Sequence, residues 1–373
     1  MKFSMIFEAQ TVDTSRKAEY QVMHESVEQA VLAEKMGFDR IWAVEHHCLK
    51  WYAHMSASET FLAYVAGRTE RIRIGHGVVC LPFRMNHPVK VAERIAMLDI
   101  LSKGRVDFGI GKGGTPQEAG AFQTEMSEIP AQLEESARML PEMWREEIFE
   151  HHSETMEIPP RPILPKPHQD PHPPMYLACT REETLNQAGE WGLGALVLGF
   201  GGPEEIASKN RVYRDAIKRR TAESQIPDFP VEHLSALCPA IVLDDADRAR
   251  AIGYRGQRFF TMAINHWYNP GGEAPPPVAD LGEIEDVDFL IQRGEEVRAY
   301  LAEDEIRTGT QSTGIYNPNH AYGSAEDAIA YVESLIEAGA DEVMFLIQMG
   351  TVPQEAALET IENLGRDVLP RFR

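Results

Sequence analysis

The segment Arg71–Gly111, RIRIGHGVVCLPFRMNHPVKVAERIAMLDILSKGRVDFGIG, determines the fold class that we predict for this chain. It begins and ends with short apolar runs, 71–82 and 105–111, whose length and composition are typical of buried strands. Between them, apolar residues recur at helical spacing and stop before a glycine at 104: Val91, Ile95, Leu98 and Leu101. The segment therefore predicts a strand, an amphipathic helix and a second strand, which is the repeating unit of an α/β protein.

The same alternation runs along most of the 373 residues. Eight apolar runs, each followed by a helical segment, predict strands that start near Lys2, Arg40, Arg71, Arg105, Met175, Ala195, Leu234 and Asp341. Continuously apolar strands need cover on both faces, and eight of them fit a closed parallel barrel better than an open sheet. We therefore predict a (β/α)8 TIM barrel over residues 1–373, a single domain with insertions at the carboxyl ends of the strands. Functional residues are expected at those ends.

Two segments interrupt the alternation. Residues 158–174 contain eight prolines and predict an extended connector, because proline neither continues a helix nor donates to a strand ladder. Residues 269–288 combine glycine, proline and acidic residues, which predicts a lid or a linker. In a barrel the second segment would lie over the catalytic end, so we favour the lid.

Composition excludes several classes of partner. The formal charge is −22 at pH 7, with 36 Lys and Arg against 58 Asp and Glu, so the protein would repel nucleic acid and anionic membranes. No apolar run approaches the roughly 18 residues of a membrane span, and no targeting signal is apparent, so we expect a cytoplasmic protein. The four cysteines are far apart and no HxH pair occurs, so neither a disulfide framework nor a bound metal is expected.

The segment Arg40–His47, RIWAVEHH, ends a predicted strand with three titratable side chains. Adjacent residues of a strand point to opposite faces, so His46 and His47 would not bind one metal together. A core histidine beside a surface histidine is one interpretation. The other follows from position, because a histidine at the carboxyl end of a barrel strand can exchange protons with a ligand.

A glycine-rich segment, Gly109–Pro116 with the sequence GIGKGGTP, also ends a strand. It resembles a dinucleotide fingerprint only weakly, because TPQEAGAF is a poor start for the helix that such a motif requires. Its glycines would still let backbone amides approach a phosphate or a ring, with Lys112 supplying charge. A tight turn is the alternative interpretation.

In Tyr176–Asn186, YLACTREETLN, a strand leads directly into a helix. The first turn of that helix brings together two hydroxyls and a guanidinium, from Thr180, Arg181 and Thr184, where free amides favour an anion. This predicts a phosphate site. A Thr N-cap with a solvated Arg fits the segment equally well.

Five segments, in this order, resemble the bacterial luciferase family of flavin-dependent monooxygenases. They are WAVEHH (42–47), GRTERIRIGHGVVCLP (67–82) with HPVKVAERIAMLDILSKGRVDFGIGKGG (87–114), MYLACTREETLNQAGEWGL (175–193), HWY (266–268) and GSAEDAIAYVESLIEAGADEVMFLIQMGTV (323–352). Ordered agreement over most of the chain is specific. The resemblance implies a (β/α)8 barrel with a flavin site at the carboxyl ends of the strands.

The resemblance also implies roles for individual residues. His46 matches a histidine that transfers protons during oxidation of reduced flavin, with Glu45 and His47 orienting it and packing beside it. Gly77–Val78 matches a non-proline cis peptide packed against the flavin ring. The cofactor-binding residues that the resemblance implies are Glu45, Gly77, Val78, Gly111, Lys112, Gly113, Thr180, Arg181 and Thr184.

Three departures from the family pattern limit what the resemblance implies. Gly111 replaces a cysteine beside the flavin and would leave room for a different substrate. Pro130 stands near the position of a second phosphate-binding arginine, which Arg181 would replace. The substrate pocket has no clear match, although four aromatic residues are candidates for it: Trp51, Phe83, Trp267 and Tyr268. Light emission is therefore not implied.

The predicted function is that of a two-component monooxygenase. FMN would arrive as FMNH2 from a separate flavin reductase and react with O2 to form a C4a-peroxide, which oxygenates a small apolar organic substrate. The alternatives are a deazaflavin-dependent oxidoreductase, which EHH disfavours, a non-catalytic flavin-binding protein, which His46 and the phosphate turn disfavour, and a metal-dependent hydrolase. Segments 58–70 and 89–101 match the helices through which luciferase subunits associate, which implies a homodimer; packing within the monomer is the alternative.

Overall fold

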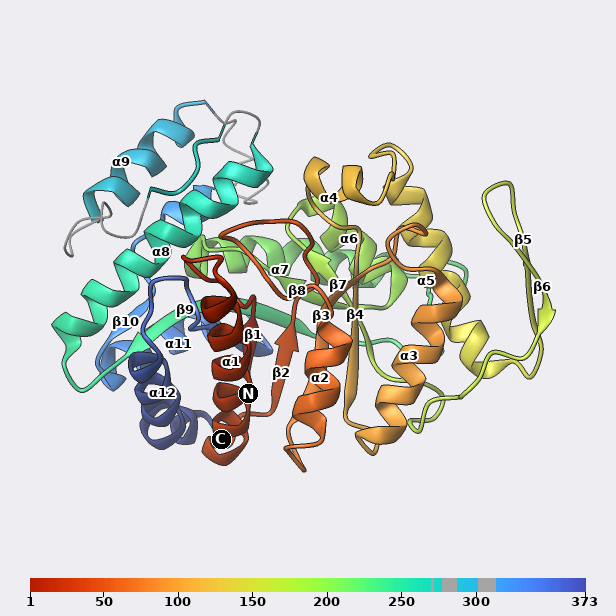
Figure 1. Ribbon diagram of the computed structural model, residues 1–373, viewed down its shortest axis with the longest axis horizontal. Coiled ribbons are helices and arrows are strands. Elements are labelled where there is room, and N and C mark those ends of the chain that lie inside the picture. The colour runs from red at the N-terminus through yellow and green to blue at the C-terminus, as the bar shows by residue number, and fades with distance from the viewer. Residues whose placement is uncertain (270–271, 277–286, 301–312) are drawn as a thin grey trace.

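A computed structural model of the chain describes residues 1–269, 272–276, 287–300 and 313–373. Eight parallel strands form a closed ring, because β8 pairs with β9 as well as with β7. Each begins close to a predicted start, which confirms the predicted TIM barrel (Figure 1). The ring consists of β1 (Lys2–Phe7), β2 (Arg40–Ala43), β3 (Arg73–Cys80), β4 (Val106–Gly111), β7 (Met175–Cys179), β8 (Gly194–Val197), β9 (Leu234–Val242) and β11 (Glu342–Leu346).

Helices follow the strands and cover the outside of the ring (Figure 1). Capping residues set their ends: before α1, the Ser15 side chain accepts a hydrogen bond from the Ala18 N–H, and Gly37 ends this helix in the left-handed conformation at φ 88°. The helices are α1 (Arg16–Met36), α2 (Ser58–Ala66), α3 (Pro88–Leu101), α4 (Pro116–Ala121), α5 (Ile129–Arg145), α6 (Glu182–Trp191), α7 (Gly202–Arg219), α8 (Ala246–Tyr268), α9 (Val287–Arg298), α11 (Ala325–Glu337) and α12 (Gln354–Asn363).

Helix α3 uses most of its predicted apolar stripe to cover the barrel. Val91, Ile95 and Leu98 are buried in the core. Leu101, which the pattern placed in the same stripe, is 66% exposed, so that assignment is wrong. The buried residue at this end is Ser102, four positions after Leu98, because the 3.6-residue turn carries Leu101 away from the core.

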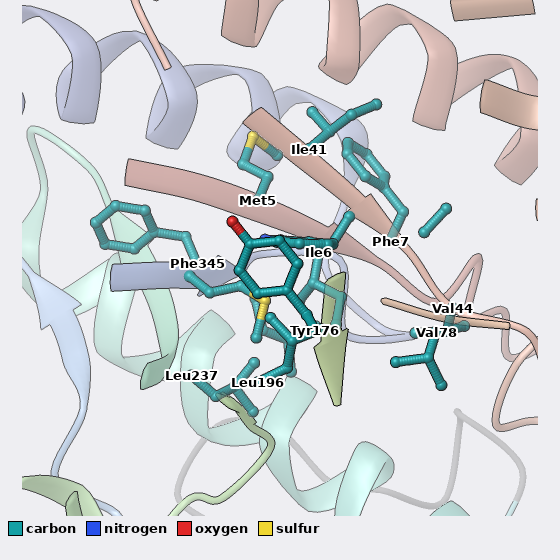
Figure 2. Packing of buried hydrophobic residues seen from close by; sticks show 14 of the residues in the cluster. Met5, Ile6, Phe7, Ile41, Val44, Val78, Tyr176, Leu196, Leu237 and Phe345 are labelled. Atoms are coloured by element: carbon teal, nitrogen blue, oxygen red, sulfur yellow. The ribbon is translucent and has the colours of Figure 1, made fainter. Parts of the chain in front are cut away.

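Apolar side chains from several strands fill the interior of the barrel. Figure 2 shows Ile6, Tyr176, Leu196 and Leu237 together in the interior. Met5 and Phe345 come directly before the cavity-lining residues Ile6 and Leu346 in their strands, so they point to the opposite face, toward the helices. Interdigitated side chains of this kind make a TIM barrel a packed core and not a pore. The packing gives the strand ends a rigid support.

A polar network closes the amino end of the barrel around Glu342, the first residue of β11. Trp42 Nε1 donates to its carboxylate at 2.9 Å, His233 Nε2 lies 2.8 Å away, Arg40 Nη1 lies 3.3 Å away, and Ser4 Oγ also donates. Burial alone would raise the pKa of this fully buried carboxyl, but the charge of Arg40 and the hydrogen bonds lower the pKa to about 2. The carboxylate is therefore fully partnered.

The predicted proline-rich connector is only partly an extended connector. Its first residues, 158–161, belong to β6 (Glu157–Arg161), which pairs with β5 (Phe149–His152) in a hairpin that projects from the barrel (Figure 1). The prediction is wrong for these four residues. The two prolines in β6 are tolerated because the ladder is irregular where they lie, so fewer N–H donors are needed.

Three further elements complete the description. A short strand, β10 (Ala321–Gly323), pairs in parallel with β9 on the outside of the ring. The lid or linker predicted at 269–288 lies mostly outside the described residues. Within the described part of the chain, every helix is too short or too polar to cross a lipid bilayer.

Candidate active site at the carboxyl end of the barrel

A cavity of about 370 Å³ opens at the carboxyl end of the barrel. Its walls come from the ends of all eight barrel strands and from helices α5, α6, α7 and α8. All ten residues predicted for the site line it: Glu45, His46, Gly77, Val78, Gly111, Lys112, Gly113, Thr180, Arg181 and Thr184. The fold therefore brings the predicted residues to one place, while their roles in binding and catalysis stay predictions.

The EHH residues lie in the segment after β2 and not in the strand as predicted, because β2 ends at Ala43. His46 Nδ1 lies 3.0 Å from Oε1 of Glu118, and His47 Nε2 lies 2.9 Å from Oε1 of Glu45. The two histidines thus have separate carboxylate partners. Glu45 and His47 were expected to orient His46. The carboxylate that hydrogen-bonds the His46 ring is instead that of Glu118, so the expected partner is wrong.

Glu118 is a site residue that sequence reasoning missed. Its buried carboxylate accepts four hydrogen bonds, at Oε1 from His46 Nδ1 and the His47 N–H, and at Oε2 from the N–H and hydroxyl of Thr115. Thr115 and Glu118 form a capping box at the start of α4, so TPQEAGAF starts a helix well and the contrary prediction is wrong. The T-x-x-E spacing is the signal from which Glu118 could have been found.

Glu118 stabilises the protonated form of His46. Burial would raise the pKa of Glu118, but the hydrogen bond from His46 and three others lower it, so the carboxylate is ionised. Burial would lower the pKa of His46, but the hydrogen bond to Glu118 raises it, as do the carboxyls of Glu8, Glu118 and Glu45 in their ionised forms. An ionised carboxylate only accepts, so Nδ1 of His46 carries a proton and Nε2 remains for proton exchange.

Glu8, which follows β1, is a second residue that sequence reasoning missed. It lines the cavity and is only 6% exposed. Burial raises its pKa to about 7, although the charge of His46 and a hydrogen bond from Tyr52 oppose the rise. One oxygen, Oε2, has no hydrogen-bond partner among the described residues. The acid that directly follows the apolar run KFSMIF is the sequence signal for it.

Aromatic side chains line the cavity near Glu8. Tyr52 and Tyr268 hydrogen-bond each other, and burial raises the pKa of both hydroxyls well above the usual range. Of the four aromatic residues predicted as candidates for the substrate pocket, Tyr268 lines the described part of the cavity. The other three lie outside this lining: Trp51, Phe83 and Trp267. Three aromatic residues of the lining were not predicted: Tyr52, Phe200 and Phe260.

The cavity wall formed by β3 and β4 presents backbone and small side chains. The Gly77–Val78 peptide bond is cis, as the resemblance implies. A Cβ on Gly111 would lie 2.3 Å from Cγ2 of Val78, so a side chain at this position would displace the valine. The room that Gly111 was expected to leave for a substrate is therefore occupied by Val78, and that expectation is wrong. Gly113 has a positive φ of 74°, as a tight turn requires.

The turn from β7 into α6 forms another wall. The hydroxyl of Thr184 donates to the Arg181 carbonyl at 2.9 Å and accepts from the Arg181 N–H at 3.3 Å. Arg181, and not a threonine, is the N-cap residue of α6. Its side chain and Thr180 are exposed, and both line the cavity together with Lys112. Because first-turn N–H groups lack intrahelical acceptors, this turn is suited to an anion.

These features fit a flavin mononucleotide. The wall formed by β3 and β4 presents backbone and small side chains, so a flat ring can approach it closely. The α6 turn offers N–H groups and cations to a phosphate. The His46–Glu118 pair offers a proton. No group of three potential metal-ligand residues occurs in the described part of the chain.

Comparisons with known proteins show the family to which the chain belongs. A model of the luciferase-like monooxygenase family matches residues 1–342. The oxygenase component of a flavin-dependent trigonelline monooxygenase from Acinetobacter baylyi is 25% identical, over 100% of this chain and 96% of that protein. Protein y4vJ of Sinorhizobium fredii is 32% identical over 48% of this chain and 50% of its own length. An F420-dependent glucose-6-phosphate dehydrogenase from Amycolatopsis mediterranei is 32% identical over 49% of this chain and 56% of that protein.

Solved structures share the fold. Monooxygenase RslO1 from Streptomyces bottropensis has a TM-score of 0.77 at 24% identity, with 100% of both chains covered. The oxygenating constituent of 3,6-diketocamphane monooxygenase from Pseudomonas putida, in complex with FMN, has a TM-score of 0.75 at 17% identity, over 100% of this chain and 99% of that chain. The chain belongs to the luciferase-like monooxygenase family.

Proposed function

We propose that this chain is the oxygenase component of a two-component monooxygenase. It would take FMNH2 from a separate flavin reductase and use O2 to oxygenate a small apolar organic substrate, through a flavin C4a-peroxide. The observation that carries the proposal is the His46–Glu118 pair at the cavity, in which the hydrogen bond to Glu118 favours the protonated form of His46 and raises its pKa. A relative named as an oxygenase component supports the separate reductase, and an FMN complex of a structural relative supports the cofactor.

The overall reaction balances with the groups at the cavity. One atom of O2 enters the substrate, and the other leaves as water with the two hydrogens that FMNH2 gives up. The flavin supplies the two electrons. The chain would bind the phosphate through Arg181, Thr180 and Lys112 and move a proton at Nε2 of His46. Apolar residues of the lining would exclude water and hold an apolar substrate: Ile6, Val44, Leu237, Phe260, Ile264 and Leu346.

A second candidate function is hydride transfer with the deazaflavin F420. Relatives whose names include F420 support it: a glucose-6-phosphate dehydrogenase and a secondary alcohol dehydrogenase. This reaction transfers a hydride to or from the cofactor and consumes no O2. Dependence on O2 therefore separates the two candidates.

The test is a stopped-flow experiment with the full chain. Anaerobic protein loaded with FMNH2 would be mixed with aerated buffer, with free FMNH2 as the control. The proposed function predicts a C4a-peroxide absorbance that precedes oxidised FMN and is missing from the control. Oxidation without this intermediate would identify a flavin-binding protein that lacks the activity. Binding of reduced F420 in preference to FMNH2 would favour the hydride-transfer candidate.

We also propose that the chain forms a homodimer through α2 and α3. Their outer faces leave large apolar side chains exposed: Tyr64, Met97, Ile100 and Leu101. Burying them between two copies would stabilise a two-fold dimer. Sedimentation at micromolar concentration should show a dimer, and the double variant Met97→Glu/Leu101→Glu should be monomeric. Tyr20→Glu, at an exposed apolar residue of α1, is the matched control and should remain dimeric.

A further inference from the structure

Glu8 is a buried acid for which the proposed function has so far given no role. It follows β1 at the carboxyl end of the barrel, lines the cavity and is only 6% exposed. Its Oε2 has no hydrogen-bond partner among the described residues, although buried carboxyl oxygens are normally paired. This oxygen is therefore a buried, unpaired acceptor on a residue of the cavity wall.

The titratable groups that face Glu8 come from three segments. His46 and Tyr52 lie after β2, Glu118 lies on α4, and Tyr268 ends α8. The Tyr52 hydroxyl hydrogen-bonds the carboxyl of Glu8, and its ring centroid lies 5.0 Å from that of His46. Tyr52 thus contacts both the acid and the imidazole, and Glu8 and His46 belong to one polar cluster.

Two carboxyls flank His46 in opposite environments. Glu118 accepts four hydrogen bonds, which lower its pKa, so it is ionised and has no proton to give. Glu8 has few donors, and burial raises its pKa to about 7, so a large share of its carboxyl is neutral at physiological pH. Carboxyls whose surroundings separate their pKa values in this way serve as the acid and the base of an active site.

We propose that Glu8 is a second acid–base residue of the flavin site. As a neutral carboxylic acid, Glu8 holds a proton for the oxygen atom that leaves as water. The inference rests on the proposed monooxygenase function. Under this inference, Glu8, which follows β1, and His46, which follows β2, carry out different proton transfers.

The proton balance requires two transfers per turnover. When the O–O bond breaks, one oxygen atom would bond to the substrate and the other would stay bonded to the flavin. When that C–O bond breaks in turn, the oxygen would take the proton of Glu8 and leave as water. The Glu8 carboxylate then regains a proton that the reduced flavin releases on returning to FMN. His46, held by Glu118, serves the earlier proton transfer, on the oxygen side of the reduced flavin. No co-reactant beyond O2 and FMNH2 is needed.

The test compares three variants of the full-length protein. Glu8→Gln keeps the size of the side chain and removes the acid, and Glu8→Asp keeps the acid. Glu25→Gln is the matched control, because burial also raises the pKa of Glu25 and this residue lies outside the cavity lining. Circular dichroism would first establish that each variant folds.

The first measurement needs no flavin. Infrared difference spectra of the protein would be recorded across neutral pH, to follow the carboxylic-acid band and its loss on ionisation. We expect a band that disappears near pH 7 in the wild type and in Glu25→Gln and is missing from Glu8→Gln. An identical band in Glu8→Gln and in the wild type would overturn the proposal.

The second measurement is the return of bound FMNH2 to FMN after mixing with O2. Without a substrate both oxygen atoms leave together as hydrogen peroxide, and this departure requires the same proton. Glu8→Gln should slow this step by about 10² or more and remove its pH dependence near neutrality, and Glu8→Asp should restore part of the rate. Wild-type rates and pH dependence in Glu8→Gln would overturn the proposal. Failure of the wild type to bind FMNH2 would instead refute the proposed monooxygenase, and the infrared measurement would still decide whether Glu8 titrates.

Discussion

Two buried carboxyls lie at opposite ends of adjacent strands, Glu8 after β1 and Glu342 at the start of β11. Burial is the largest influence on both, and it raises the pKa of each. At Glu342 the charge of Arg40 and hydrogen bonds from His233 and Ser4 overcome burial and lower the pKa to about 2. At Glu8 the charge of His46 opposes burial only partly, and the pKa rises to about 7.

The difference shows how one barrel separates stability from chemistry. At the amino end, every oxygen of Glu342 has a donor, so its charge holds strands together. At the carboxyl end, Glu8 keeps one oxygen without a partner among the described residues, and burial raises the pKa of its carboxyl to about 7. Incomplete pairing of a buried group costs stability, and such groups are found where function requires them.

The largest expected effect is on the rate of chemistry at the carboxyl end. His46→Ala should still fold and bind FMN, but lose roughly 10² to 10⁴ in the rate of peroxide formation, because positioned proton transfer contributes about that much. His47→Ala is the matched control, since His47 pairs with Glu45 and not with Glu118 through its side chain. Its rate should stay near that of the wild type once FMNH2 is saturating.

Stopped-flow traces for both histidine variants would be compared between roughly pH 6 and pH 9, around the ~6.5 reference pKa of histidine. Urea denaturation would measure the free energy of unfolding in parallel. Near-normal rates for His46→Ala at every pH would remove its catalytic role. A large loss of stability in His46→Ala would mean that the carboxyl end of the barrel also contributes to stability.

Glu342→Gln should have the largest effect on stability. Removing the charge leaves Arg40 without a buried partner carboxylate on β11, and breaking a buried ion pair costs about 3 to 5 kcal/mol. Because the folded pKa is depressed, the stabilisation is present above the unfolded value of 4.5 and is lost as pH falls toward 2. Urea denaturation at neutral pH measures the loss, with Glu223→Gln as an exposed control. Equal stability of both variants would contradict the network.

Glu8→Gln should have the opposite effect on stability. Because the folded pKa is raised, the neutral acid is compatible with burial at low pH, and the wild type loses stability as pH rises from 4.5 to about 7. Ionising the buried carboxyl costs about 3 kcal/mol above that range, a cost that glutamine avoids. Urea denaturation at pH 5 and pH 8 should therefore show Glu8→Gln gaining relative to the wild type at the higher pH. A pH-independent difference would contradict the raised pKa.

Local sequence patterns predicted the fold and much of the site. Each barrel strand is a short apolar run, because both faces of the strand are covered, and this can be read from neighbouring residues alone. His46, the 180–184 turn and the glycines of β4 were found because they follow such runs at the catalytic end of the barrel. The cis bond at Gly77–Val78 came from the resemblance to a known family and is confirmed.

Partners distant in sequence were not predicted. Glu118 lies 72 residues from His46, and only the closed ring brings the two side chains to 3.0 Å. Sequence reasoning instead chose Glu45 as the partner because it is adjacent to His46 in the chain. Glu8 was passed over for a related reason, since a raised pKa depends on burial and on the donors that surround the carboxyl, and neither is visible in a run of residues.

The smallest expected effect is on cofactor affinity at the α6 turn. Arg181 is exposed, so a charge-assisted contact with phosphate is screened by water, and Arg181→Ala should weaken FMN binding by about tenfold. Riboflavin lacks the phosphate, so its affinity should be the same in the variant and in the wild type. Anaerobic calorimetry with both ligands isolates the phosphate contribution, and urea denaturation should show unchanged stability because Arg181 forms no part of the buried network. Equal FMN affinity of variant and wild type would remove Arg181 from the site and leave the turn as a helix cap. A matching loss for riboflavin would instead mean that the arginine supports the shape of the cavity and not the phosphate.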